Sequence, residues 1–254
     1  MRKNKARQSQ IADLILEQGS LTAQELAEMF GVSVMTIHRD LDELERQGVL
    51  RKARGVATAQ PSGVFEARVA FRHAAAVDQK RRIAQAALRH VESGMSVMLD
   101  DSTTVLHMIP GLAELAPLHV ATNFLAALKE LAALPDIRVI GIGGDYDPLH
   151  DSFQGMHAIE IIQDIHADVL FMSTSAVTAG HAYHQEERIV AFKRAMIESA
   201  SARYLLVDSS KLDRTALHRL APLSAFDLLI TDSEASPQAL NSLDAAGANV
   251  EVAS

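Results

Sequence analysis

Short apolar runs alternate with helical patterns through the larger, C-terminal part of the chain. Helical patterns lie between most of the runs, including residues 123–134, 155–165 and 187–202. Runs of this length separated by helices predict an α/β domain with a largely parallel sheet and helices on both faces. The predicted strands are Val97–Leu99, Leu118–Ala121, Ile137–Ile140, Val169–Met172, Tyr204–Val207, Leu228–Ile230 and Asn249–Val252.

The first sixty residues have a different pattern, with three helical stretches. The first covers residues 6–18, and a capping box formed by Thr22 and Glu25 opens the second. Gly31 supplies the turn into the third helix, which runs from a cap at Ser33 to about Gln47. Two short β-prone runs then flank residues 51–55 and predict a hairpin. Three helices followed by a hairpin wing form a winged helix-turn-helix.

The third helix has an apolar face and a polar face. Ile37, Leu41 and Leu44 recur at helical spacing and should face a small core. The opposite face suits phosphates and base edges, and the basic tip of the hairpin suits the phosphate backbone. The predicted DNA contacts are Ser33, Met35, Thr36, His38, Arg39, Arg51, Lys52 and Arg54. Phosphate would repel Asp40, so we expect that carboxylate to bond an arginine or a helix amide instead.

Charge is divided unevenly along the chain. Residues 1–60 hold 9 basic and 8 acidic residues, whereas the remainder holds 15 and 24, for a net charge of −8. This division suits a DNA-binding head on an acidic body, although ordinary solvated side chains would give similar counts. The absence of cysteine excludes disulfides, thiol catalysis and cysteine zinc sites, and fits the cytoplasm. No apolar run approaches the roughly 18 residues of a membrane span, and an aromatic content of 4% argues against RNA stacking platforms.

The expected domains are residues 1–58, a linker at 59–70 and an α/β domain at 71–254. Pro61, Ser62 and Gly63 interrupt regular structure in the linker. A long helix is predicted over 71–91. Its exposed face should hold Lys80, Arg81 and Arg82, and its inner face Ile83, Ala87 and Leu88.

Polar residues follow several of the predicted strands. The carboxyl ends of parallel strands meet at one edge of the sheet, where ligands bind in open α/β folds. Hydroxyls at helix starts, a lysine and carboxylates would together suit a phosphorylated sugar, although each hydroxyl alone is more often a plain helix cap. The predicted effector-binding residues are Asp100, Asp101, Ser102, Thr103, Thr104, Thr122, Asn123, Gly143, Gly144 and Lys211.

Two sets of residues resemble the DeoR family of bacterial transcription regulators. In the head they are Arg7, Ile11, Ile15, Ser33 and Thr36–Leu41, with His38 where the family more often has arginine. In the α/β domain they are Leu99–Thr104, Ala121–Asn123, Ile142–Gly144, Phe192–Ile197, Asp208–Lys211 and Ile230–Asp232. Ser102 stands where the family commonly has glycine. Ser173–Ala176 stands where the family usually has a segment with two glycines.

The resemblance implies a repressor of a sugar or polyol operon. Its α/β domain would have a fold similar to that of ribose-5-phosphate isomerase and would bind a phosphorylated sugar. The implied partners are operator DNA and further copies of the chain, as a dimer or tetramer, with no cofactor, metal or catalytic residue.

Other readings of the sequence stay open. A sugar-phosphate isomerase could use Asp100, Asp101, Glu186 and Lys211 as acid–base groups. A three-helix head could serve protein contacts alone. His181, His184 and Glu187 could bind zinc, although we expect them to line the effector pocket.

Overall fold

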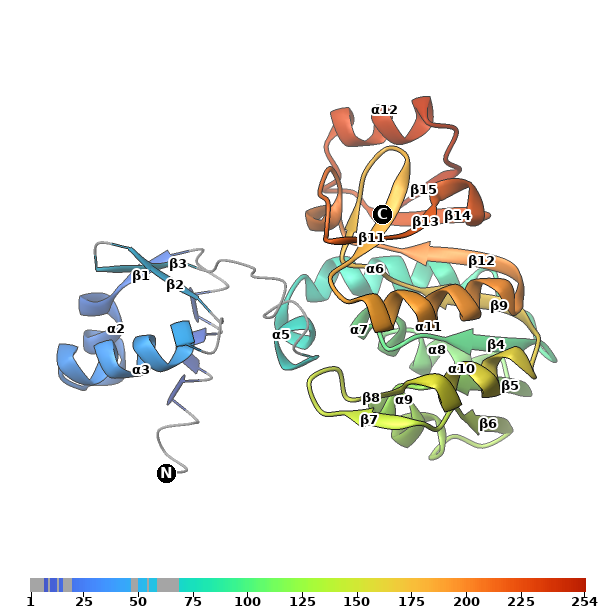
Figure 1. Ribbon diagram of the computed structural model, residues 1–254, viewed down its shortest axis with the longest axis horizontal. Coiled ribbons are helices and arrows are strands. Elements are labelled where there is room, and N and C mark those ends of the chain that lie inside the picture. The colour runs from blue at the N-terminus through green and yellow to red at the C-terminus, as the bar shows by residue number, and fades with distance from the viewer. Residues whose placement is uncertain are drawn as a thin grey trace. The chain divides into compact units, whose positions relative to one another are not determined.

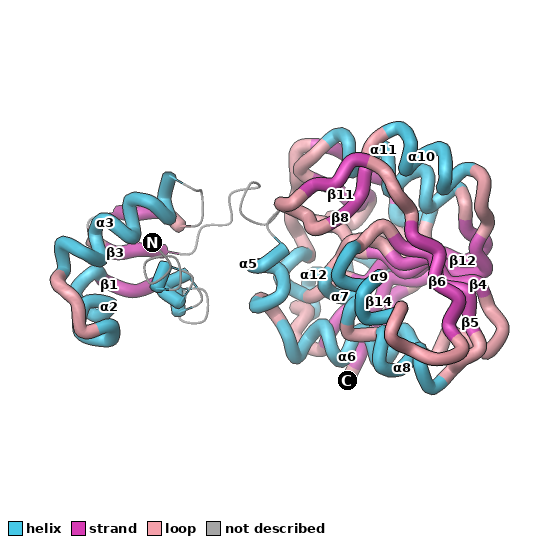
Figure 2. Tube along the Cα trace, turned by 90° about the horizontal axis from the view of Figure 1, so that it is seen from below, coloured by secondary structure: helices cyan, strands magenta, loops and turns pink. Residues whose placement is uncertain are grey.

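The computed structural model describes residues 7, 8, 10–12, 14, 15, 20–46, 50–53, 55–58 and 69–254. Contacts divide the chain into two units, Met1–Ala75 and Ala76–Ser254, and each is described by itself. Figures 1 and 2 show the elements of both units. The predicted linker lies mostly outside the described residues, so its boundaries stay a prediction.

The first unit contains the predicted helices and the wing. Its elements include β1 (Ser20–Thr22), α2 (Ala23–Phe30), α3 (Val34–Arg46), β2 (Arg51–Ala53), β3 (Val56–Thr58) and α5 (Val69–Ala74). Strands β2 and β3 form the expected antiparallel hairpin, and β1 pairs with the other side of β3. The strand β1 was not predicted, because its three residues precede a helix and read only as a cap.

Local hydrogen bonds explain where α2 and α3 begin and end. The amide of Glu25 donates to Thr22 Oγ1 at 3.1 Å and the amide of Thr22 donates to the Glu25 carboxylate at 2.7 Å, which is the predicted capping box. Gly31 ends α2 at φ 61°, a left-handed conformation that favours glycine. Ser33 Oγ accepts from the amide of Thr36 at 3.2 Å and caps α3.

The second unit is built around a seven-stranded parallel sheet with the order β15-β14-β12-β9-β4-β5-β6. All seven predicted strands are confirmed. They are β4 (Ser96–Leu99), β5 (Leu118–Thr122), β6 (Ile137–Gly141), β9 (Ala167–Met172), β12 (Ala200–Leu206), β14 (Leu228–Asp232) and β15 (Val250–Ala253).

Helices cover both faces of this sheet (Figure 2). On one face α10 (Met156–Gln163) packs against α11 (Glu187–Glu198), and on the other α8 (Ile109–Glu114) contacts both α6 (Val77–Leu88) and α9 (Leu125–Leu131). The remaining helices are α7 (Thr103–Leu106) and α12 (Pro237–Ala245). None of the described helices is both long enough and apolar enough to span a membrane.

Three predictions about the helices were wrong. The stretch 71–91 is not one helix, because α5 ends at Ala74 and Ala76 takes a left-handed conformation at φ 52°. Lys80 is not exposed but almost fully buried. The pattern of α11 was also extended too far, since the strand β12 already begins at Ala200.

Two small antiparallel sheets complete the second unit, and neither was predicted. One joins β7 (Asp145–Asp147) to β8 (Ser152–Gln154). The other has the order β10-β11-β13, formed by Ala176–Val177, His181–His184 and His218–Pro222. These strands are short, and all except the two-residue β10 contain polar residues, so they lack the apolar runs that mark the central sheet.

Candidate DNA interface and effector site

The two faces of α3 lie as the sequence predicts. Ile37 and Leu41 are fully buried against the first helical segment and α2, within the core of the first unit. On the other face Met35 is 64% exposed, and Arg39 is also exposed. Helix α3 therefore presents a mixed apolar and cationic surface at its N-terminal half.

Charge is separated along α3. His38 and Arg39 lie in the first half, whereas Asp42, Glu43 and Glu45 lie in the second. None of the residues that the structure describes forms an ion pair with Arg39, whereas Arg46 pairs with Glu43 at 2.5 Å. The positive end of α3 is thus available to an anionic partner.

Asp40 is held inside the first unit. Its carboxylate lies 2.6 Å from Arg7 Nε and accepts from Gln8 Nε2 at 3.0 Å. The expected arginine bond is confirmed, and it ties the first helical segment to α3. The carboxylate is therefore neutralised within the protein and does not repel DNA phosphates.

The wing gives less support to the predicted contacts. The ammonium of Lys52 forms an ion pair with Asp42, and its amide donates to Glu45 Oε1 at 2.7 Å. Lys52 is thus bound to α3 before any DNA arrives. Arg54 and the side chain of Arg51 lie outside the described residues, so their DNA contacts stay predictions.

In the second unit, Asp100 follows β4 and is fully buried. One oxygen of its carboxylate accepts from the amide of Ser102 at 3.0 Å, and the other accepts from the amide of Ser173 at 2.8 Å and pairs with Lys193. Both oxygens are occupied, so Asp100 orients the loops that follow β4 and β9.

Lys193 on α11 was not among the predicted site residues. It is 2% exposed, and its Nζ lies 3.4 Å from Asp101 Oδ1 and 3.2 Å from the carbonyl of Ser173. A helical pattern alone does not show which lysine turns inward, and its acidic partners lie more than 90 residues away. The only signal was that Lys193 belongs to a stretch that resembles the DeoR sensor.

Lys211 reaches the same edge from the segment after β12. Its Nζ lies 3.1 Å from Ser173 Oγ and 3.8 Å from the Asp208 carboxylate. Burial raises the pKa of Asp208, but Lys211, Ser210 and Lys80 together lower that pKa below its usual value. Ser173 therefore joins Lys211 to Asp100, and the predicted meeting of polar strand ends is present.

The other predicted effector residues have structural contacts as well. Ser102 Oγ caps α7 by accepting from the amide of Val105, and Thr122 Oγ1 accepts from the amide of Phe124. Gly144 has a φ of 138°, and a Cβ there would lie 2.4 Å from the carbonyl of Gln154. The glycine at this position is therefore required by the close passage of β8, which the sequence did not indicate.

A group of ionisable side chains lies beside this edge. The ligand atoms of Asp147, His150 and Glu186 fall within 4.8 Å of one another. Arg188 already pairs with both carboxylates and His150 bonds Glu186 at 2.7 Å, so we describe this group as an ion-pair cluster rather than a metal site. None of its three members is among the residues that the sequence suggested as possible zinc ligands, which are His181, His184 and Glu187.

His184 stays neutral in this environment. Burial, and after it the charge of Lys193, lowers the pKa of His184 to about 3. Its Nδ1 accepts from the amide of Glu186 at 3.2 Å. The imidazole therefore acts as a buried neutral group near Lys193.

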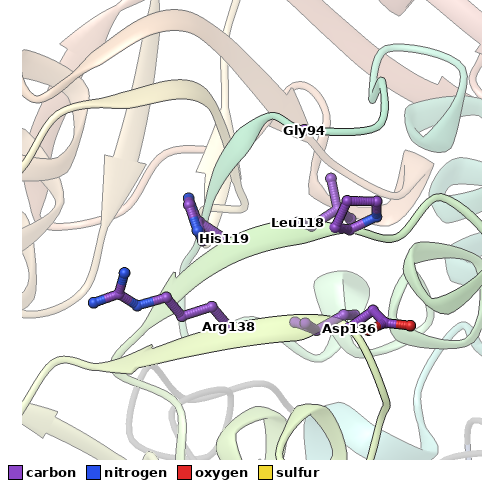
Figure 3. Close-up of a pocket in the computed structure, with 7 residues that line it drawn as sticks. Gly94, Leu118, His119, Asp136 and Arg138 are labelled. Atoms are coloured by element: carbon purple, nitrogen blue, oxygen red, sulfur yellow. The ribbon is translucent and has the colours of Figure 1, made fainter.

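A hollow of about 490 Å³ lies at the opposite edge of the sheet (Figure 3). It is formed where β5 and β6 begin, and His119 and Arg138 extend from these neighbouring strands. It is lined by Gly94, Pro117, Leu118, His119, Asp136, Ile137 and Arg138. None of the predicted effector residues belongs to it.

A winged helix-turn-helix whose recognition helix exposes an arginine in its N-terminal half, joined to an α/β domain, defines a DNA-binding regulator with a sensor domain. Two family models match the chain, the DeoR-like helix-turn-helix domain over residues 7–62 and the DeoR C terminal sensor domain over residues 75–233. The chain belongs to the DeoR family of transcriptional regulators.

Relatives with known names are also regulators. A putative aga operon transcriptional repressor of Escherichia coli O157:H7 is 30% identical over 96% of this chain and 92% of its own length. An L-fucose operon activator of Haemophilus influenzae is 29% identical over 87% of this chain and 89% of its own. A solved structure of ribose 5-phosphate isomerase A from Methanocaldococcus jannaschii aligns over 53% of each chain, at 17% identity and a TM-score of 0.38. Similarity at that level identifies neither an activity nor a ligand.

Proposed function

We propose that this protein represses a sugar or polyol catabolic operon, and that a phosphorylated sugar bound by the second unit releases it from operator DNA. The observation that carries the proposal is the exposed, unneutralised positive end of α3, in one chain with a polar strand-end site that includes Lys211. The names of the two relatives connect such chains to sugar operons, one as a repressor and one as an activator. We propose repression rather than activation because the DeoR family resemblance implies a repressor. Operator DNA and phosphorylated sugars meet in the cytoplasm, where we place the protein.

On DNA, we expect α3 to enter the major groove with its N-terminal half. Arg39 and His38 would contact guanine edges or phosphates, and Met35 and Thr36 would pack against base edges. Two or four copies of the chain would read repeated half-sites, because helix-turn-helix proteins usually bind as symmetric oligomers.

In the second unit, we place the phosphate near Lys211 and Ser173. Lysine donates to phosphate as a point charge, and the hydroxyl of Ser173 lies 3.1 Å from that ammonium. For release to follow binding, the effector must bind one arrangement of the protein more tightly. A 100-fold change in DNA affinity requires about 2.7 kcal/mol of coupling between the two sites.

The test uses fluorescence anisotropy with duplexes from upstream of neighbouring catabolic genes. We expect binding at moderate salt, release by at least one sugar phosphate, and loss of binding in Arg39→Ala. An absence of binding by the wild type, or isomerase turnover that Arg39→Ala leaves unchanged without any DNA binding, would overturn the proposal. Tighter binding on adding the effector would instead indicate an activator.

A further inference from the structure

Two buried side-chain amides in the second unit each leave one oxygen without a partner. Asn123 and Gln154 are both almost fully buried, and no described residue donates to Asn123 Oδ1 or Gln154 Oε1. Such an oxygen is unfavourable unless something donates a hydrogen bond to it. The pair therefore calls for a donor that the described protein does not supply.

The orientation of both amides follows from their other hydrogen bonds. Asn123 Nδ2 donates to the carbonyl of Phe153 at 2.9 Å, so the amide nitrogen must face that carbonyl. Ser152 Oγ donates to Asp101 Oδ2 at 2.9 Å and must accept from Gln154 Nε2, which lies 3.0 Å away. In both side chains the unpartnered atom is thus the carbonyl oxygen, which can only accept.

These amides lie among the predicted effector residues. Gln154 is joined through Ser152 to Asp101 after β4, and its backbone passes close to Gly144 after β6. Asn123 follows β5 and pairs with Phe153 in β8 through both its amide and its carbonyl. Strand β8 thus lies across the carboxyl ends of β4, β5 and β6, on the side away from Lys211, which follows β12.

We infer that Gln154 and Asn123 accept hydrogen bonds from the hydroxyl groups of the effector, and that Gln154 is a specificity-determining residue of this site. The inference rests on the proposed function. Phosphate oxygens are acceptors at neutral pH and would be repelled by two carbonyl oxygens, whereas sugar hydroxyls donate. The effector therefore binds with its phosphate toward Lys211 and its polyol part toward β8.

Entry of the ligand requires a local movement, because both oxygens are shielded from solvent. The segment from Asp145 to Gln154 contacts the start of α11 through side chains, His150 with Glu186 and Asp147 with Arg188. Arg188 is more than half exposed, so its ion pair with Asp147 is partly screened by water, whereas His150 is almost fully buried where it meets Glu186. These side-chain contacts are separate from the hydrogen bonds of the parallel sheet.

The test measures dissociation constants of the full-length protein by calorimetry. The probes are inorganic phosphate, glycerol 3-phosphate, glucose 6-phosphate, fructose 6-phosphate and galactose 6-phosphate. For the tightest sugar phosphate we expect Gln154→Met to weaken binding about tenfold or more, the effect of losing one well-formed hydrogen bond. The affinity for inorganic phosphate should change less than twofold, whereas Lys211→Met should weaken both.

Two controls make the result specific. Gln163→Met changes an exposed glutamine at the end of α10 and should leave every affinity unchanged. Deoxy analogues of the tightest sugar phosphate identify the hydroxyl, because its removal should weaken binding to the wild type but add nothing in Gln154→Met. If Gln154→Met does not fold, Gln154→Asn retains the amide but shortens its reach and should also weaken binding.

The outcomes separate the two proposals. If Lys211→Met weakens binding of a sugar phosphate and Gln154→Met does not, the inference about Gln154 is overturned and the proposed function stands. If no compound of the panel binds the wild type, the phosphorylated effector itself is wrong, and the inference fails with it.

Discussion

The two units use charge in opposite ways. Arg39 in the first unit is exposed and has no ion-pair partner among the described residues, whereas Lys193 in the second is 2% exposed and lies against Asp100 and Asp101. An exposed cation attracts a polyanion over long range and depends on salt. A buried ion pair fixes the geometry of the loops around it, and either partner alone would be very unfavourable. Removal of the Arg39 charge should therefore alter binding, whereas removal of the Lys193 charge should alter stability.

The largest effect is expected for Lys193→Met. This substitution leaves two buried carboxylates without their cation and should lower the free energy of unfolding of the second unit by about 3–5 kcal/mol. All three tyrosines, Tyr146, Tyr183 and Tyr204, lie in the second unit and the chain has no tryptophan. Tyrosine fluorescence during urea unfolding therefore reports on this unit. Lys129→Met, at an exposed position, is the matched control. Equal losses of unfolding free energy in the two variants would contradict the view that the buried Lys193 pair stabilises the second unit.

The next effect concerns Arg39→Ala. Loss of one base or phosphate contact should weaken operator binding by about 1–3 kcal/mol, while the unfolding midpoint stays unchanged. Anisotropy titrations at several salt concentrations measure this. Arg46→Ala is the control, because Arg46 is bound to Glu43 at the other end of α3. An equal loss of affinity in both variants would show that the N-terminal half of α3 has no special role.

A third effect depends on pH. The pKa of His184 is about 3 in the folded protein, against 6.5 ordinarily, so between these values the unfolded chain binds a proton that the folded chain does not. Stability should therefore fall as the pH falls below about 6.5, by about 2 kcal/mol at pH 5. The free energy of unfolding, measured with urea at pH 7.5, 6 and 5, should fall with pH in this way in the wild type and not in His184→Asn. His157→Asn, at an 83% exposed position, should keep the wild-type slope.

The smallest effect is expected at the wing. Lys52 is already paired with Asp42, and such surface pairs contribute about 0–1 kcal/mol, so Lys52→Ala should change stability and DNA affinity little. Asp42→Ala should strengthen DNA binding modestly, because it removes a carboxylate and frees a cation. The same titrations measure both, and a large loss in Lys52→Ala would show that the wing lysine leaves Asp42 to bind DNA.

The central sheet and the recognition helix could be predicted because their signals are local. Buried parallel strands appear as continuous apolar runs, and helix caps such as Thr22 and Ser33 lie within a few residues of their partners. The break before α6 could not be predicted, since residues 74–76 are alanines with no helix breaker among them. Lys80 on α6 was placed outside because charged residues are mostly exposed.

The candidate effector site was only half predictable. Rules about strand ends gave Asp100 and Lys211, and the structure brings both to Ser173. Lys193 and Gln154 lie 93 and 54 positions beyond Asp100, on a helix and in a polar hairpin, and no local pattern joins them to it. Contacts of this kind depend on tertiary packing alone.

The strand order also determines when the sheet can form during synthesis. Strands β4, β5 and β6 are neighbours in both sequence and space, but the other side of β4 pairs with β9, Val97 facing Val169. Pairings between distant segments form slowly and expose unpaired strand edges until they close. Until residues 167–172 of β9 have been made, β4 has no partner on that side and its edge stays open.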